Sequence, residues 1–136
     1  MSTTDTKLRG AAARPLSPHL DIYRFSWTMA MSIVHRITGA ALYVGTALLA
    51  IWLIAAASGA SSFAAVQWFM ASFIGKLILF GYTWALMHHM LGGVRHLVWD
   101  MGLGFDRDRR FAMAKINLYG SVALTILIWV VYYIVR

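Results

Sequence analysis

The residues best suited to chemistry in this chain lie together between positions 87 and 100. This stretch holds His88, His89 and His96, three of the five histidines, together with Arg95, and it ends a long apolar run. Ionisable residues at the edge of a membrane span are costly to place there, so by default they mark a functional site.

His89, Gly93 and His96 occupy positions i, i+4 and i+7, so on a helix they share one face. A histidine followed one turn later by glycine leaves a strip of backbone uncovered, and a flat macrocycle can lie against it. Neutral imidazole ligates haem iron, and haem propionates need cationic or donor partners. The spacing predicts a haem whose iron is bound by His89, with Gly93 allowing close packing and His96 at the charged edge.

The neighbouring side chains leave alternatives open. Arg95 is expected either to join the propionate site or to pair with Asp100. His88 is expected to pack or to form hydrogen bonds within the bundle, although its place beside His89 keeps both histidines as candidate ligands. His96 and Arg95 also suit ordinary positions at the membrane interface.

A second polar group, Ser32, His35 and Arg36, lies near the start of the first apolar run. Ser32 and Arg36 are i, i+4 neighbours on a helix face. A hydroxyl and a guanidinium on one face can donate hydrogen bonds to a small carbonyl or carboxylate ligand. The simpler alternative is a snorkelling arginine beside an interfacial histidine. Three such residues within five positions favour a polar pocket.

Helices that cross a membrane must position these groups. The 136 residues are 60% hydrophobic and only 12% charged, whereas soluble domains carry about a quarter charged residues. Runs of roughly 20 apolar residues are long enough to span a bilayer. We therefore predict an all-α membrane protein with a single domain, residues 1–136. It consists of a cytoplasmic segment, 1–28, and transmembrane helices at 29–57, 66–99 and 113–135.

The net charge of +7 is explained by topology, and no nucleic-acid partner is expected. Basic residues precede the first span or lie between the second and third, whereas the connection 58–73 carries no charge. The positive-inside rule then places the N-terminus and the second loop in the cytoplasm and Arg136 on the far side. The basic residues concerned are Lys7, Arg9, Arg14, Arg24, Arg107, Arg109, Arg110 and Lys115.

The chain has no cysteine, which excludes disulfides and iron–sulfur ligation by its own residues. Residues 1–13 lack the apolar core of a signal peptide. Asp5 and the shortness of this segment argue against an organelle transit peptide. The sequence therefore favours the bacterial cytoplasmic membrane over the mitochondrial inner membrane.

Depth along the helices suggests that the site is incomplete within this chain. His89 lies roughly 16 Å along its helix from Asp100 at about 1.5 Å per residue, whereas His35 and His96 are expected near the cytoplasmic end. His35 is then displaced from His89 by about two turns, and the third span contains no histidine. We expect a second iron ligand from another polypeptide.

Two stretches resemble the cytochrome b anchor subunits of succinate dehydrogenase (succinate:quinone oxidoreductase). The first comprises residues 14–20 (RPLSPHL) and 32–39 (SIVHRITG), and the second comprises residues 89–102 (HMLGGVRHLVWDMG). Both motifs stand in order at matching places relative to three spans. With the shared topology, the resemblance covers nearly the whole chain.

This resemblance implies one of two anchors that hold a haem b and reduce ubiquinone in a four-subunit complex. A flavoprotein subunit would oxidise succinate, and an iron–sulfur subunit would relay the electrons. His89 would be an axial ligand of the haem iron, with a histidine of the partner anchor opposite. Ser32 and Arg36 match quinone-site residues, His35 matches a residue near the propionates, and His96 falls in the same environment.

The chain alone would then carry no succinate chemistry, and its three helices would form part of a bundle completed by the partner anchor. A haem-free structural anchor and a fumarate-reductase type of anchor, working in the opposite direction, are the alternatives. A transporter subunit with a His/Arg proton path is a third class. Three spans without an internal repeat do not suit a self-contained transporter.

Overall fold

The computed structural model describes residues 17–135, and these form four helices in the order α2, α3, α4 and α5. Their bounds are α2 Trp27–Ala57, α3 Ala60–Ala71, α4 Phe73–Asp100 and α5 Arg107–Val135. The expectation of an all-α membrane protein is confirmed, because α2, α4 and α5 are each long and apolar enough to cross a membrane. Residues 1–16 of the predicted cytoplasmic segment lie outside the described residues.

The sequence predicts one continuous helix over 66–99, and the chain instead divides this range at Ser72. Ser72 has extended backbone (φ −65°, ψ 163°), and its side chain caps α4 by accepting a hydrogen bond from Gly75 N at 3.1 Å. Gly75 lies so close to the backbone of Met70 that a Cβ there would overlap it. The break lets α3 fold back against α4. The turn between α2 and α3 is short, because α2 ends at Ala57 and α3 begins at Ala60.

Side-chain caps also mark the starts of α2 and α5. Ser26 caps α2, with its hydroxyl accepting a hydrogen bond from Met29 N at 3.4 Å. Asp106 stands immediately before α5 and accepts from Arg109 N at 3.0 Å. Such caps satisfy backbone donors that have no partner inside the helix.

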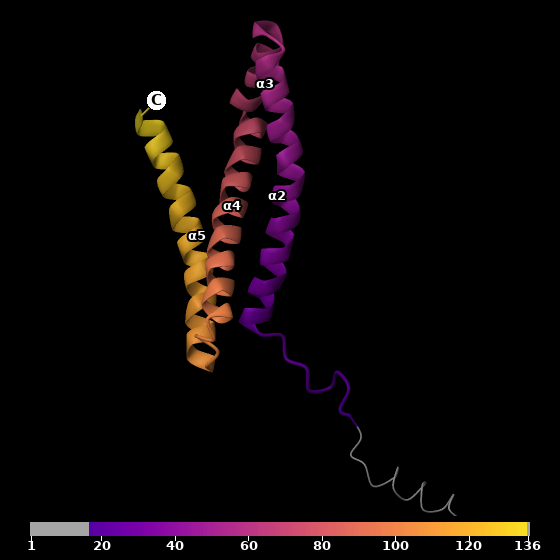
Figure 1. Cartoon of the computed structure of the whole chain (residues 1–136), viewed down its shortest axis with the longest axis vertical. Coiled ribbons are helices and arrows are strands. Elements are labelled where there is room, and N and C mark those ends of the chain that lie inside the picture. Colours follow the sequence, from indigo (N-terminus) through magenta and orange to yellow (C-terminus); the bar gives the residue numbers. More distant parts are fainter. Residues whose placement is uncertain (1–16, 136) are drawn as a thin grey trace, which may run out of the picture.

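Helix α4 lies between α2 and α5, and α5 diverges from α4 toward the C-terminus (Figure 1). The end of α4 and the start of α5 lie near the start of α2, which places the polar motifs at one end of the bundle. Small residues allow α2 to approach α4, as in many membrane interfaces. A Cβ at Gly45 would overlap the ring of Tyr82.

The buried residues of this chain are largely polar. Within residues 17–135 the buried polar or charged side chains are Thr38, His88, Arg95, Asn117, Ser121 and Thr125, and the buried apolar ones are Met31, Ala55, Ala85 and Ala114. Apolar side chains such as Tyr43, Leu53 and Ile134 instead point outward. This inversion suits helices in lipid, where polar groups must be satisfied inside the protein.

Candidate haem and quinone site

His89 of α4 has one ring nitrogen engaged and the other available. Its Nδ1 lies 3.1 Å from the backbone oxygen of His35 in α2. Because a carbonyl oxygen only accepts, Nδ1 must carry the proton, and Nε2 keeps its lone pair. Metal-binding histidines are typically held in this way, with the second ring nitrogen donating to a carbonyl or carboxylate. The half-buried His89 ring therefore leaves the lone pair of Nε2 available to a metal.

The carbonyl that holds His89 belongs to a residue whose own ring packs on His89. The His35 and His89 rings stack with centroids 4.1 Å apart and planes at 12°. The same carbonyl accepts a hydrogen bond from Thr38 Oγ1 at 2.9 Å. One turn of α2 therefore contributes a ring, a carbonyl and a supporting hydroxyl to the surroundings of His89.

Two glycines make this interlocking of α2 and α4 possible. A Cβ at Gly39 would lie 2.9 Å from Cε1 of His89, so the ring of His89 rests on the bare backbone of α2. A Cβ at Gly92 would overlap the ring of His35, which rests in the same way on α4. Each histidine thus occupies the space that the other helix leaves by having a glycine there.

Gly93 lies on the open side of the same turn. Apart from its chain neighbours and the backbone of its own part of α4, no atom of the described residues comes within 4 Å of the place where its Cβ would stand. The uncovered strip of backbone that the sequence predicts beside His89 is therefore present in the folded chain. A flat macrocycle bound through His89 Nε2 has room to lie against it, so the donor chemistry and the open strip both fit a haem.

The expected depth of His35 is wrong. The sequence places His35 about two helical turns from His89, but the two rings are in contact. Helix α2 begins at Trp27, ten residues before the apolar run that starts at Ile37, so His35 lies about 12 Å into the helix. His89 lies at nearly the same depth, about 16 Å from the end of α4. The inference that a partner must supply the second ligand no longer follows from depth.

His96 and Arg95 differ in exposure and in the side chains that they contact. His96 is exposed, and its ring meets those of His35 and Trp99 edge-on, at 5.2 Å in each case. Arg95 is only 4% exposed and lies over the ring of Trp99, with Cζ 5.0 Å from its centroid. Within residues 17–135 Arg95 forms no ion pair with Asp100. Of the two roles expected for Arg95, the pair with Asp100 is therefore not formed, and a contact with a haem propionate stays a prediction.

His88 is enclosed between α4 and α5. Its side chain is fully buried, Nδ1 lies 3.3 Å from Ser121 Oγ, and Nε2 lies 3.4 Å from Asn117 Nδ2. Since both ring nitrogens already have partners, this side chain offers no lone pair to iron. Between the two adjacent histidines, the geometry favours His89 as the ligand.

Ser32 and Arg36 lie on α2 one turn apart, near His35. Ser32 is half-buried and Arg36 is exposed, and neither side chain has a hydrogen-bond partner among the described residues. Their donors are therefore available to a ligand at the membrane surface of this end of the bundle. His35 Nε2 is likewise unpartnered, but it is buried against Gly92 and does not face outward.

Three histidine rings in contact do not make a site for a bare metal ion here. Within residues 17–135 no group of three or more His, Cys, Asp or Glu side chains is arranged to hold one.

Sequence reasoning missed Thr38, Gly39 and Gly92 as parts of the site. The sequence indicated Gly93 in place of the adjacent Gly92. The available signal was helical spacing, because Gly39 follows His35 by one turn just as Gly92 follows His89 by nearly one.

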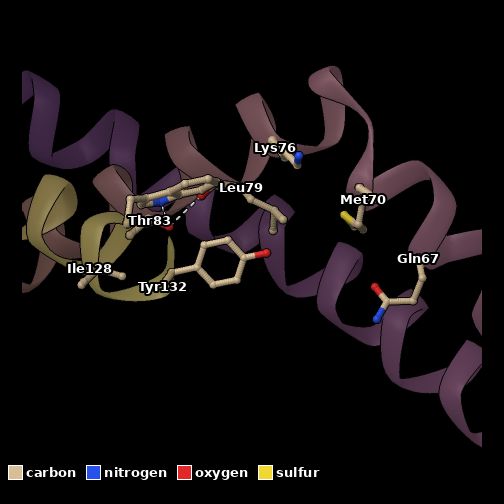
Figure 2. A pocket seen from close by; sticks show the side chains of 9 residues that line it. Gln67, Met70, Lys76, Leu79, Thr83, Ile128 and Tyr132 are labelled. Atoms are coloured by element: carbon tan, nitrogen blue, oxygen red, sulfur yellow. Dashed lines mark hydrogen bonds between the residues drawn. The ribbon is translucent and has the colours of Figure 1, made fainter. Parts of the chain in front are cut away.

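A cavity of ≈ 500 Å³ lies elsewhere, between α3, α4 and α5. Figure 2 shows Tyr132 and Gln67 pointing toward it. At its edge, Trp129 Nε1 donates a hydrogen bond to Thr83 Oγ1. None of the candidate site residues lines this cavity. It therefore has no part in the histidine site.

Comparisons with known proteins agree with this geometry. Residues 11–131 match the family described as succinate dehydrogenase/fumarate reductase transmembrane subunit. The chain is 40% identical to the succinate dehydrogenase cytochrome b556 subunit of Paracoccus denitrificans over 121 residues, covering 89% of this chain and 93% of that protein. It is 35% identical to the corresponding subunit of Rickettsia felis over 133 residues, covering 93% and 99%.

A mitochondrial protein is also similar. The succinate dehydrogenase cytochrome b560 subunit of Sus scrofa is 40% identical over 95 residues, which is 67% of this chain and 55% of that protein. The match to the family extends over most of the chain and includes all three apolar helices. The resemblance inferred from the two sequence motifs is confirmed, and the chain belongs to the family of succinate dehydrogenase and fumarate reductase transmembrane subunits.

Proposed function

We propose that this chain is a membrane anchor of a succinate:quinone oxidoreductase that binds one haem b through His89 and helps to bind ubiquinone through Ser32 and Arg36. The observation that carries the haem assignment is the hydrogen bond from His89 Nδ1 to the His35 carbonyl, at 3.1 Å. It leaves Nε2 as a ligand beside the open strip at Gly93.

When bound, the haem supplies one-electron redox chemistry between the iron–sulfur subunit and the quinone. His89 holds the iron, Gly93 admits the macrocycle, and the exposed His96 lies on the same face, where it can donate to a propionate. His35 acts mainly through its carbonyl and its stacked ring. Arg95, which is buried over Trp99, supports the helix end.

The second axial ligand comes from a partner anchor in this proposal. The ring of His35 stacks on that of His89, and its Nε2 is buried against Gly92, so His35 is not free to bind the same iron. His88 has both nitrogens engaged, and His96 lies on the same side as His89.

The proposed quinone binding depends on the unpaired hydrogen-bond donors of Ser32 and Arg36. A hydroxyl and a guanidinium one turn apart can hold a quinone carbonyl and stabilise the negative charge that develops as it is reduced. Succinate oxidation would take place on the flavoprotein subunit, with electrons passing through the iron–sulfur subunit. We place the complex in the bacterial cytoplasmic membrane with the N-terminus of this chain inside, and the succinate-to-quinone direction is part of the proposal.

The test is the haem content and the reduced-minus-oxidised spectrum of the purified complex. His89→Ala should remove the haem or change its ligation, whereas His19→Ala, outside the spans, should leave the spectrum unchanged. Gly93→Leu should also reduce haem content by blocking the strip. Gly81→Leu is its matched control, since Gly81 of α4 is exposed with no described atom within 4 Å of its Cβ position.

A wild-type complex without b-type absorbance would contradict the haem assignment and favour a haem-free structural anchor. Retention of an unchanged spectrum by His89→Ala would show that another residue binds the iron. Equal haem loss in Gly93→Leu and Gly81→Leu would show that bulk on α4, rather than the strip, is responsible.

A further inference from the structure

A buried polar cluster joins α4 to α5 through His88, Asn117 and Ser121. His88 and Ser121 are fully buried and Asn117 is 1% exposed. The amide Nδ2 of Asn117 only donates, so His88 Nε2 accepts at 3.4 Å and the proton is on Nδ1. That proton goes to Ser121 Oγ at 3.3 Å, and Ser121 Oγ in turn donates to the carbonyl of Leu118 at 2.8 Å. The directions of the three bonds agree with a single neutral ring tautomer.

The ring of His88 is also held by packing. Trp84, one turn earlier on α4, has its ring centroid 5.3 Å away. With partners at both nitrogens and an aromatic neighbour, the ring has little rotational freedom. Any rotation of α4 about its axis would break both hydrogen bonds to α5.

His88 and His89 are consecutive, so on an α-helix they point about 100° apart. The first faces α5, and the second faces α2 and bonds the carbonyl of His35. The rotational setting of α4 is therefore held by polar contacts on two sides. The direction in which His89 Nε2 points depends on that setting.

The surrounding lipid does little to restore the rotation of α4 once its polar contacts with the neighbouring helices are lost. Helices in a bilayer gain little from burying apolar surface against each other, and packing and hydrogen bonds decide how they fit. An apolar residue at position 88 would leave the buried amide Nδ2 of Asn117 without a partner and would remove one of the two hydrogen bonds of Ser121 Oγ. Buried polar groups without partners are costly. Rotation or a shift of α4 would then lower the free energy by relieving this cost.

From this arrangement we infer that His88 is a positioning residue, which sets the rotation of α4 through Asn117 and Ser121 and thereby aims His89 Nε2 at the haem iron. The inference rests on the proposed function, because it assumes that His89 is the iron ligand. It gives a role to a histidine that binds no ligand itself.

The experiment uses the purified intact complex and measures the haem midpoint potential and the electron paramagnetic resonance g-values of the oxidised haem. His88→Leu should retain haem with a shifted potential and altered g-values, because the axial imidazole is reoriented. The matched control is Thr83→Val, which removes a different α4–α5 hydrogen bond, from Trp129 Nε1 to Thr83 Oγ1 at 3.3 Å. It should leave both readouts at wild-type values.

A partner swap provides the rescue. His88→Asn combined with Asn117→His restores a histidine–asparagine pair across α4 and α5 and should return both readouts toward wild type. Ser121→Ala removes one bond from His88 and should give a smaller shift of the same sign, so it decides the question if His88→Leu fails to assemble.

Wild-type readouts in His88→Leu, or in Ser121→Ala if the former fails to assemble, would overturn the inference. An equal change in Thr83→Val would also overturn it, because general loosening of the α4–α5 contact would then be the cause. These results are distinguishable from failure of the proposed function. In that case His89→Ala itself would retain an unchanged haem spectrum.

Discussion

His88 and His89 show how two identical side chains acquire different uses from their surroundings. The ring of His88 has a partner at each nitrogen and is fully buried. The ring of His89 donates from Nδ1 and leaves Nε2 free beside an open strip of backbone. The difference arises from which neighbouring helix each ring faces.

Arg36 provides the sharpest residue-level prediction for the quinone. Arg36→Leu removes the exposed guanidinium and should lower succinate:quinone reductase activity by 10-fold or more, on the order of the effect of losing one donor to a developing negative charge. Succinate oxidation with an artificial electron acceptor should stay close to wild type, because that chemistry lies on another subunit. Both rates are measured on the same membranes.

Lys115→Leu is the control for Arg36→Leu, because Lys115 is also an exposed cation but stands on a different helix, α5. It should leave both activities near wild type. A parallel loss of quinone reduction and artificial-acceptor activity in Arg36→Leu would indicate failed assembly instead of a lost quinone contact.

At the scale of the elements, glycines set how closely α2 and α4 approach. Gly39 and Gly92 admit the two stacked histidines, and Gly45 admits the ring of Tyr82. Loss of any one of these glycines puts a methyl group where a ring already lies. The same close approach aligns the carbonyl of His35 with His89. The packing of α2 against α4 is therefore coupled to the tautomer and orientation of the His89 ring.

Gly45→Ala should destabilise the α2–α4 contact by about 1–3 kcal/mol, the usual range for overpacking a filled interface. Thermal unfolding of the detergent-solubilised complex, followed by loss of haem absorbance, measures the effect. Gly81→Ala, on an open surface of α4, should leave the midpoint near wild type. Combining Gly45→Ala with Tyr82→Leu should recover part of the loss, and no recovery would show that Tyr82 is not the obstacle.

Across the whole molecule, little of the apolar surface is covered by the chain itself. Only 11%, 17% and 11% of the most apolar windows of α2, α4 and α5 are buried. The rest must meet lipid or other subunits. The ring of His89 is half-buried against α2 and the ring of His96 is exposed. The side of α4 that they share with Gly93 is open, and the proposed partner anchor would complete the haem site there.

The predicted orientation can be tested because the chain has no native cysteine. Asp21→Cys and Met101→Cys introduce single exposed thiols at the proposed cytoplasmic end, and Ser61→Cys introduces one on α3 at the other end. A membrane-impermeant maleimide added to intact spheroplasts should label only the third variant, and permeabilised cells should label all three. Labelling is read on the isolated subunit, and the reverse pattern would show that the topology is inverted.

The sequence by itself determined the membrane class, the three apolar helices, the family and the shared face of His89, Gly93 and His96. Apolar run length and helical periodicity are local properties, so they can be read without knowing how the helices pack. The break at Ser72 escaped prediction, because the apolar run continues through it and the cause is the close approach of Gly75 to α3.

Only the tertiary structure decided how the polar residues meet. It brought His35 against His89, turned Arg95 onto Trp99 and gave His88 its partners on α5. These outcomes depend on the relative depth and rotation of neighbouring helices. In a membrane such settings are chosen by glycine gaps and pairs of hydrogen-bonding groups distant in sequence, and the periodicity of a single helix does not contain them.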